Sequence, residues 1–88
     1  MRESEIEKYL VKRVKELGGQ IRKVQWIGRN GAPDRRVMLP NRFPVWVELK
    51  ATGKKAEPHQ VREHTRMRGL GELVEVIDSI EAVDELLT

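Results

Sequence analysis

The sequence predicts an α/β fold in which helices pack on a mixed β-sheet, with the element order α-β-β-β-α-β-α. Three observations predict it: an N-terminal stretch with apolar residues at helical spacing, two alternating apolar segments around a short turn, and a second helix–strand–helix series towards the C-terminus. The chain has 88 residues, so it is expected to form one domain, residues 1–88, around one modest core.

The first helix is expected over residues 3–17, before the helix-ending pair Gly18-Gly19. Ile6 lies at the edge of its apolar stripe, and the stripe itself is formed by Leu10, Val14 and Leu17. Residues 20–26 alternate loosely between apolar and polar and predict a strand. Residues 28–33 contain two glycines, an asparagine and a proline, which are typical of a loop.

A hairpin is expected between residues 35–39 and 43–50, with Asn41 at the centre of its turn. Paired residue numbers then sum to 82, which places Asp34 opposite Glu48. Facing residues of an antiparallel ladder lie about 4.5–5.5 Å apart at Cα. A slip of one residue would bury the charged side chains. The hydrophobic pattern supports this register because one face of the hairpin is then apolar: Val37, Leu39, Val45, Val47 and Leu49.

The last part of the chain adds two helices and a strand. The expected elements are a basic loop at residues 51–57, a helix from Pro58 to about Arg68, a strand at residues 72–77 and a helix ending at Leu87. Pro58 suits a first helical turn, and Gly69 and Gly71 end that helix. Asp78 and Glu81 resemble a capping box for the final helix.

Composition excludes several classes of protein. Cysteine is absent, which excludes disulfides and cysteine-zinc sites. The sequence has no signal peptide and no apolar run long enough to span a membrane, so a cytoplasmic protein is the default expectation. Lys plus Arg outnumber Asp plus Glu by 17 to 14, and the net charge of +3 permits a nucleic-acid partner without requiring one.

The hairpin carries the candidate chemistry. Glu48 and Lys50 are two residues apart on a strand and therefore share a face, and Asp34 lies across from them. Two carboxylates are ligands that Mg²⁺ prefers, and a neighbouring carbonyl, that of Leu49, could add a third. Lys50 could orient hydroxide or stabilise a phosphoryl transition state. The alternative is that Asp34 caps a turn and the Glu48–Lys50 face is merely solvated.

The first helix adds acidic residues. Glu3 and Glu7 lie on its apolar stripe, whereas Glu5 lies on the opposite face. An acid facing inward needs a partner, and Lys50 or a metal-bound water is the expected partner of Glu7. The alternative is that these acids interact favourably with the helix dipole, which accounts better for Glu3 than for Glu7.

Basic residues surround the acidic centre, as cleavage of a polyanion requires. Those expected to bind the phosphates are Arg29, Arg35, Lys54, Lys55 and Arg62, with Arg36, Arg66 and Arg68 nearby. Ordinary solubilising charge is the alternative for each of them. Gln60 could hydrogen-bond a water or a phosphate, or could simply be solvated. His59 and His64 are expected at the surface, and Trp26 and Trp46 are expected in the core rather than as base-stacking platforms.

These motifs resemble the PD-(D/E)XK nuclease superfamily and, within it, the VRR-NUC (virus-type replication-repair nuclease) domain. The shared features are a glutamate on the first helix, a G-x-P-D-R motif, a V-E-L-K strand and a glutamine on the next helix. This chain has them in that order as Glu7, Gly31-Ala32-Pro33-Asp34-Arg35, Val47-Glu48-Leu49-Lys50 and Gln60. The resemblance covers essentially the whole chain and implies a restriction-endonuclease-like sheet flanked by helices.

The resemblance also implies a Mg²⁺- or Mn²⁺-dependent DNA endonuclease. It implies that Asp34, Glu48 and the carbonyl of Leu49 hold the metal, and that Lys50 is the catalytic lysine. Glu7 is implied as the acid of the first helix, a role that Glu3 could share, and Gln60 as the helix glutamine. Standalone members of this family are often phage-encoded, and the resemblance to them implies a homodimer that acts on branched DNA such as four-way junctions.

Overall fold

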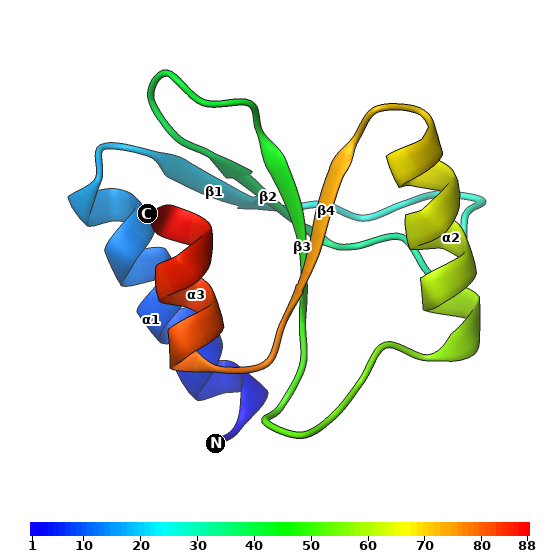
Figure 1. Ribbon diagram of the computed structural model, residues 1–88, viewed down its shortest axis with the longest axis horizontal. Helices are drawn as coiled ribbons and strands as arrows, with labels where there is room; N and C mark the ends of the chain where they lie inside the picture. Colours follow the sequence, from blue (N-terminus) through cyan, green and yellow to red (C-terminus); the bar gives the residue numbers. More distant parts are fainter.

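Seven elements follow one another in the expected order in the computed structural model, which describes residues 1–88 (Figure 1). They are α1 (Glu3–Glu16), β1 (Gln20–Lys23), β2 (Arg35–Met38), β3 (Val45–Leu49), α2 (Pro58–Gly69), β4 (Leu73–Ile77) and α3 (Ile80–Leu87). No helix is both long enough and apolar enough to cross a membrane.

The four strands form one mixed sheet in the order β1-β2-β3-β4. β1, β2 and β3 are antiparallel, whereas β3 and β4 are parallel, because α2 carries the chain back across the sheet. The β2–β3 ladder pairs Arg35 with Val47 and Val37 with Val45, which confirms the expected register. Asn41 adopts a φ of 59° within the turn, a conformation that asparagine tolerates well.

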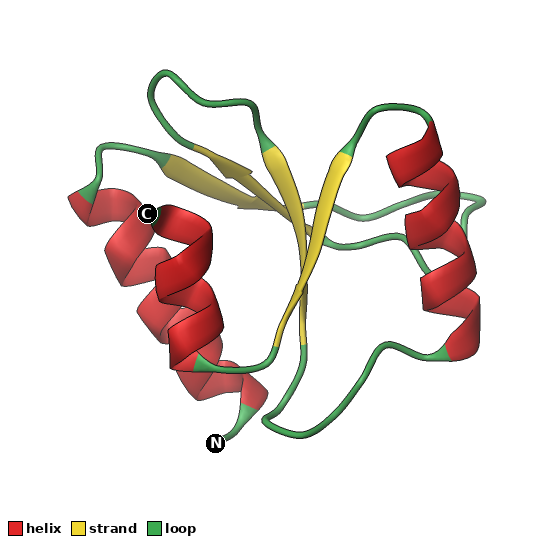
Figure 2. Cartoon of the chain, viewed as in Figure 1, coloured by secondary structure: helices red, strands yellow, loops and turns green.

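The sheet separates the helices into two layers (Figures 1 and 2). α1 and α3 cover one face and α2 covers the other. The core lies on the α1/α3 side and consists of Ile6, Leu10, Val14, Val37, Val47, Leu49, Ile77, Val83 and Leu87. The expected apolar stripe of α1 is wrong at both of its ends, at Ile6 and at Leu17. Ile6 is fully buried at its centre, and Leu17 is exposed because the helix ends at Glu16 and Leu17 is its C-cap.

Two expected boundaries are wrong, the end of β1 by three residues and the cap of α3 by one. β1 ends at Lys23 rather than at Trp26, since the chain leaves the sheet there and runs in a loop towards α2 (Figure 1). α3 is capped by Ser79, whose side chain accepts a hydrogen bond from the Ala82 amide at 3.0 Å, and not by Asp78. The carbonyl of Asp78 instead accepts a hydrogen bond from the Thr52 hydroxyl at 2.9 Å, which ties the loop after β3 to the end of β4.

Candidate active site

Asp34, Glu48 and Lys50 lie where β2 begins and β3 ends. Asp34 directly precedes β2, and its carbonyl accepts a hydrogen bond from the Val24 amide at 2.8 Å. Continuing the β2–β3 register by one step brings Asp34 opposite Glu48. The Lys50 amide donates to the Ile77 carbonyl at 2.9 Å, so parallel pairing with β4 keeps β3 extended through Lys50. The sheet therefore holds the two carboxylates and the lysine on one rigid support.

Glu48 is an acid with too little compensating charge. Its side chain is only 13% exposed, and the nearest cation, the Lys50 ammonium, is 3.9 Å away. Burial raises the pKa of the Glu48 carboxyl from its ordinary 4.5 to about 7; Lys50 opposes this rise, and Asp34 and Glu3 add to it. A cation bound among these oxygens would stabilise the charged form of Glu48 and offset its repulsion by Asp34 and Glu3.

The donor set fits a hard divalent ion that retains water. Nowhere in the molecule do three or more acidic or histidine side chains gather as a complete metal cage. Mg²⁺ does not need such a cage, because it is held by one or two carboxylates together with waters and substrate phosphate oxygens. Asp34 has an exposed side chain from which it could reach such an ion.

We expect the Glu48→Gln substitution to stabilise the metal-free protein at neutral and higher pH. The folded-state pKa of about 7 exceeds the unfolded value near 4.5, so Glu48 costs folding free energy that grows as pH rises between these values. Below pH 4.5 the wild type and the variant should have similar free energies of unfolding. Above pH 7 the variant should be more stable than the wild type by about 3 kcal/mol.

Urea denaturation in EDTA at several pH values measures this difference. Every other titrating group is common to the two proteins, so the difference between their stabilities isolates Glu48. Stability curves that run parallel from pH 5 to pH 8 would show that Glu48 is not strained in the folded state.

Glu7 has a partner other than the one expected. It bonds neither Lys50 nor a nearby backbone group but pairs with Arg35, whose Nε lies 2.7 Å from Glu7 Oε2 and whose Nη2 contacts the same oxygen. The third guanidinium nitrogen, Nη1, lies 2.8 Å from Asp34 Oδ1. Arg35 therefore joins the acid of α1 to the acid of the site.

The same geometry corrects the expectation that Arg35 binds DNA. Arg35 lies on the core face of β2, paired with Val47, and its side chain is only 10% exposed. Each of its guanidinium nitrogens faces a carboxylate, which raises the pKa of the guanidinium despite the opposing effect of burial. A cation so enclosed positions Asp34 and cannot serve a phosphate at the surface.

Glu3, in the first turn of α1, is the second acid of this helix near the site. It is exposed, yet its charge contributes to the raised pKa of Glu48. The carbonyl of Met1 accepts a hydrogen bond from the Thr52 amide at 3.0 Å, which holds the start of α1 against the loop after β3. Glu7 thus supports Asp34 through Arg35, while the charge of Glu3 helps to raise the pKa of Glu48.

The glutamine and histidines of α2 have structural contacts. Gln60 Oε1 accepts a hydrogen bond from the Glu57 amide at 2.8 Å and closes a capping box, and no hydrogen bond links it to the acids or Lys50. His59 is half-buried. The surface assignment of His64 is wrong: it is 1% exposed and its Nε2 has no partner. Burial lowers the pKa of His64, and a hydrogen bond to the Gly31 backbone opposes this.

Gly31 is where the loop between β1 and β2 packs on α2. Its φ is +87°, and a Cβ there would lie 2.7 Å from the His59 carbonyl oxygen and 3.1 Å from its carbon. Both the backbone conformation and the close approach require glycine. The helix α2 thereby fixes the segment that leads into Asp34.

We expect Gly31→Ala to destabilise the protein by about 3 kcal/mol or more, because backbone strain and a backbone clash add. Gly28→Ala is the matched control: Gly28 has a φ of +73° but no atom within 4 Å of the added Cβ. It should cost only the conformational strain of about 1 kcal/mol. Thermal denaturation of both variants measures the difference, and equal losses would mean that the packing against His59 is unimportant.

The remaining basic residues divide into free and paired cations. Lys54, Lys55 and Arg62 are exposed and form no ion pair, which suits phosphate binding. Arg29 is exposed as well, but its Nε lies 3.5 Å from Glu63 Oε2 on α2.

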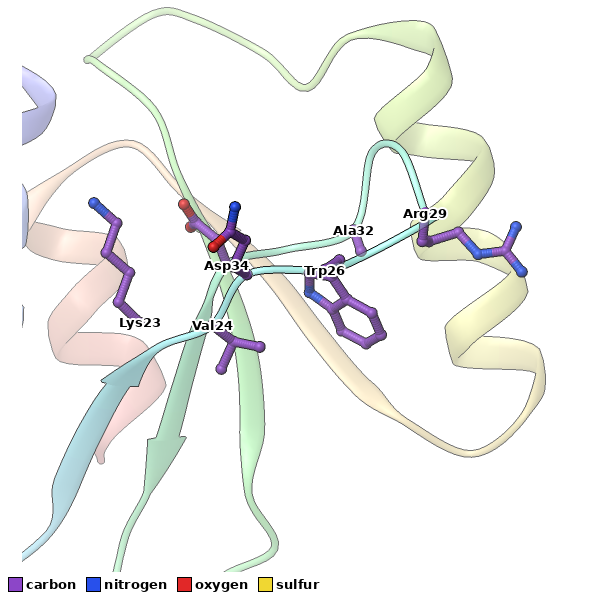
Figure 3. A pocket seen from close by; sticks show the side chains of 7 residues that line it. Lys23, Val24, Trp26, Arg29, Ala32 and Asp34 are labelled. Atoms are coloured by element: carbon purple, nitrogen blue, oxygen red, sulfur yellow. The ribbon is translucent and has the colours of Figure 1, made fainter.

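Two residues near the site were missed by reasoning from the sequence. Lys23 pairs with Arg35 at the end of β1, directly beside Asp34, and lines a cavity of about 520 Å³ together with Trp26 (Figure 3). Trp26 was expected in the core, but it is 37% exposed. A register between β1 and β2 would have revealed Lys23, but the long loop between these strands does not specify one.

Comparison with known proteins supports one family. No family model matches the chain. The chain is 49% identical over 79 residues to a protein named "Putative nuclease p44" from Acyrthosiphon pisum secondary endosymbiont phage 1, covering 90% of this chain and 85% of that protein. A solved structure described as a VRR_NUC domain has a TM-score of 0.86 at 43% identity, covering 97% of this chain and 92% of the other.

The structural likeness extends over nearly every element described above, and it confirms the expected mixed sheet flanked by helices. The sequence identity to both proteins is well above the level at which only a fold is shared. The motifs around Asp34 and Glu48, the fold and these two relatives agree, and the chain belongs to the VRR-NUC family of nucleases.

Proposed function

We propose that this protein is a Mg²⁺- or Mn²⁺-dependent DNA endonuclease that hydrolyses phosphodiester bonds at Asp34, Glu48 and Lys50. The observation that carries the proposal is the position of the Glu48 carboxyl, which is only 13% exposed, lies 3.9 Å from the Lys50 ammonium and stands across the β2–β3 ladder from Asp34. Burial there raises the pKa of Glu48 to about 7. A protein that only bound DNA would gain nothing from acids at the point where phosphates pass. This argues against the alternative, a non-catalytic basic nucleic-acid-binding module.

Each residue of the site would have a distinct role in the reaction. Asp34, Glu48 and the backbone carbonyl of Leu49 would hold the ion, and Arg35 would keep the Asp34 carboxylate in place. When bound, the ion neutralises charge on the phosphoryl oxygens and lowers the pKa of a coordinated water. Lys50, on the same face as Glu48, would stabilise the charge that develops on the reacting phosphate. Gln60 remains a proposed member of the site.

Around this centre, Lys54, Lys55, Arg62 and Arg29 would hold the DNA backbone. Their contacts would be with phosphates and therefore independent of sequence, which suits an enzyme that selects DNA by shape. We extend the proposal to a homodimer that acts on branched DNA such as four-way junctions. A chain of 88 residues presents one site, and cutting two strands of a junction calls for two.

Cleavage of labelled linear, flap and four-way-junction DNA of matched length tests this function. Cleavage is expected with Mg²⁺ or Mn²⁺, fastest on the branched DNA, and none in EDTA. Sedimentation of the free protein tests the dimer. Binding without cleavage of any substrate with either metal would leave the binding-module alternative.

A further inference from the structure

A cavity of about 520 Å³ opens beside Asp34 (Figure 3). Its lining includes Lys23, Gln25, Trp26, Arg29 and Asp34, from the end of β1 and the loop that follows. Lys23 lies on one side of Asp34, and Trp26 and Arg29 lie on the other. The volume falls in the range of small-molecule sites, about 300–1,000 Å³. One wall of this cavity is thus a carboxylate of the proposed cleavage site.

Trp26 is held in a fixed orientation at this cavity. Its indole Nε1 donates a hydrogen bond to the Pro33 carbonyl at 2.8 Å, and Pro33 is itself buried. Its ring packs on that of Trp46, with centroids 5.1 Å apart and planes at 49°. The ring is nevertheless 37% exposed. A half-exposed indole that is already immobilised can stack on a planar group with little further loss of side-chain entropy.

The cations of the cavity suit a phosphate next to that planar group. Lys23 is exposed and forms no ion pair, so its ammonium is free for a ligand. Arg29 contacts Glu63 through Nε, which anchors the outer part of the loop to α2. The close packing of Gly31 on His59 anchors the inner part. The loop therefore presents a flat aromatic face on a firm support, and the end of β1 adds the free positive charge of Lys23.

We propose that this cavity binds one unpaired nucleotide of the DNA strand next to the phosphate at Asp34. Its base stacks on Trp26 and its phosphate pairs with Lys23. A base within a duplex has both faces covered by its neighbours and cannot offer one to Trp26, whereas an unpaired base can. The inference rests on the proposed function and adds a reason for it to select branched or gapped DNA.

The test is fluorescence anisotropy with the full chain in EDTA, so that no cleavage occurs. Two labelled two-strand duplexes of equal length are compared, one fully paired and one with three unpaired nucleotides at its centre. Stacking of one base on an aromatic ring is worth about 1–3 kcal/mol, so the wild type should prefer the unpaired DNA by at least about 5-fold. Trp26→Leu should bring this ratio close to one, and Trp26→Phe should retain most of it.

Lys23→Gln provides a second variant, because this exposed side chain is not needed for folding. It should weaken binding to the unpaired DNA and reduce its salt dependence by about one phosphate contact. Phe43→Leu, which alters an exposed aromatic residue outside the cavity, is the control and should leave the ratio unchanged. In a Trp46→Phe variant, Trp26 is the only tryptophan left, and its fluorescence should be quenched by the unpaired DNA.

A wild-type ratio of one, or a ratio that survives Trp26→Leu, would overturn the inference. Cleavage is measured separately with Mg²⁺, so the two failures are distinguishable. Cleavage with a ratio of one would reject the nucleotide site and keep the nuclease. A clear preference for the unpaired DNA without cleavage under any condition would keep the nucleotide site and reject the nuclease.

Discussion

Replacing Asp34 by asparagine is expected to reduce Mg²⁺-dependent DNA cleavage by more than about 100-fold. Changes to residues that merely support metal ligands typically cost 10–100-fold in affinity or activity, so loss of a ligand should cost more. Asparagine has nearly the same shape but lacks the charge that would hold the ion. Single-turnover cleavage with saturating protein measures the effect, and calorimetric titration with Mg²⁺ measures the loss of metal binding.

The binding of DNA in EDTA should not weaken in this variant, because removing an acid lowers the repulsion of phosphates. Asp84→Asn is the matched control. Asp84 also pairs with an arginine, Arg13, at 2.6 Å, but it lies on α3 away from the site. That control should cleave at the wild-type rate. Retention of more than a tenth of the activity in Asp34→Asn would remove Asp34 from the metal site.

Replacing Arg35 by methionine is expected to lower both stability and activity. The substitution leaves Glu7 without its partner beside the core and frees the Asp34 carboxylate from its 2.8 Å contact. Breaking a buried ion pair costs about 3–5 kcal/mol, and because Glu7 is partly exposed we expect about 2–3 kcal/mol here. Cleavage should fall even under conditions where the variant remains fully folded, because Asp34 is no longer held.

A double-mutant cycle separates the role of Glu7 from that of a catalytic residue. If Glu7 acts only through Arg35, Glu7→Gln and Arg35→Met should show a coupling energy of about 1–3 kcal/mol in urea denaturation. The exposed pair of Arg2 and Glu5 is the control, with an expected coupling below about 1 kcal/mol. A loss of cleavage in Glu7→Gln as large as in Asp34→Asn would instead give Glu7 a direct role at the metal.

Activity should also depend on pH through Glu48. A metal ligand must be deprotonated, and Glu48 holds its proton up to a pKa of about 7 in the metal-free protein. At limiting Mg²⁺ concentration the cleavage rate should therefore rise as pH increases from 6 to 8. Higher Mg²⁺ concentration should shift this rise to lower pH, because the ion competes with the proton. A rise that ignores the Mg²⁺ concentration would point to another titrating group.

Local patterns were sufficient for the hairpin that builds the site. The alternation of apolar residues from Val37 to Leu49 admits only one register with a buried face, and the structure has that register. The order of the seven elements follows for the same reason, since periodicity and glycine or proline punctuation act within a few residues. Boundaries were less well predicted where long-range contacts decide them, as at Lys23 and Ser79.

Contacts between distant segments were not predictable from these patterns. His64 is polar and was expected outside, but it is buried and hydrogen-bonded to the backbone of Gly31 in the distant loop. Arg35 was expected to bind phosphates, although strand alternation places it on the face of Val37; only the fold shows that a carboxylate of α1 meets it there. Trp26 left the sheet because β1 ends early, and only then could its ring line a cavity.

The sequence by itself determined the family motifs and the register that brings Asp34, Glu48 and Lys50 together, because both depend on spacing along the chain near one hairpin. The tertiary structure alone decided that Arg35 links Glu7 to Asp34, that the charge of Glu3 acts on Glu48, and that Lys23 and Trp26 line a cavity beside Asp34. The reason is physical: these contacts depend on how α1, α2 and the long loop pack on the sheet. Such packing minimises the exposure of the whole core and satisfies buried charges, and no local pattern encodes it.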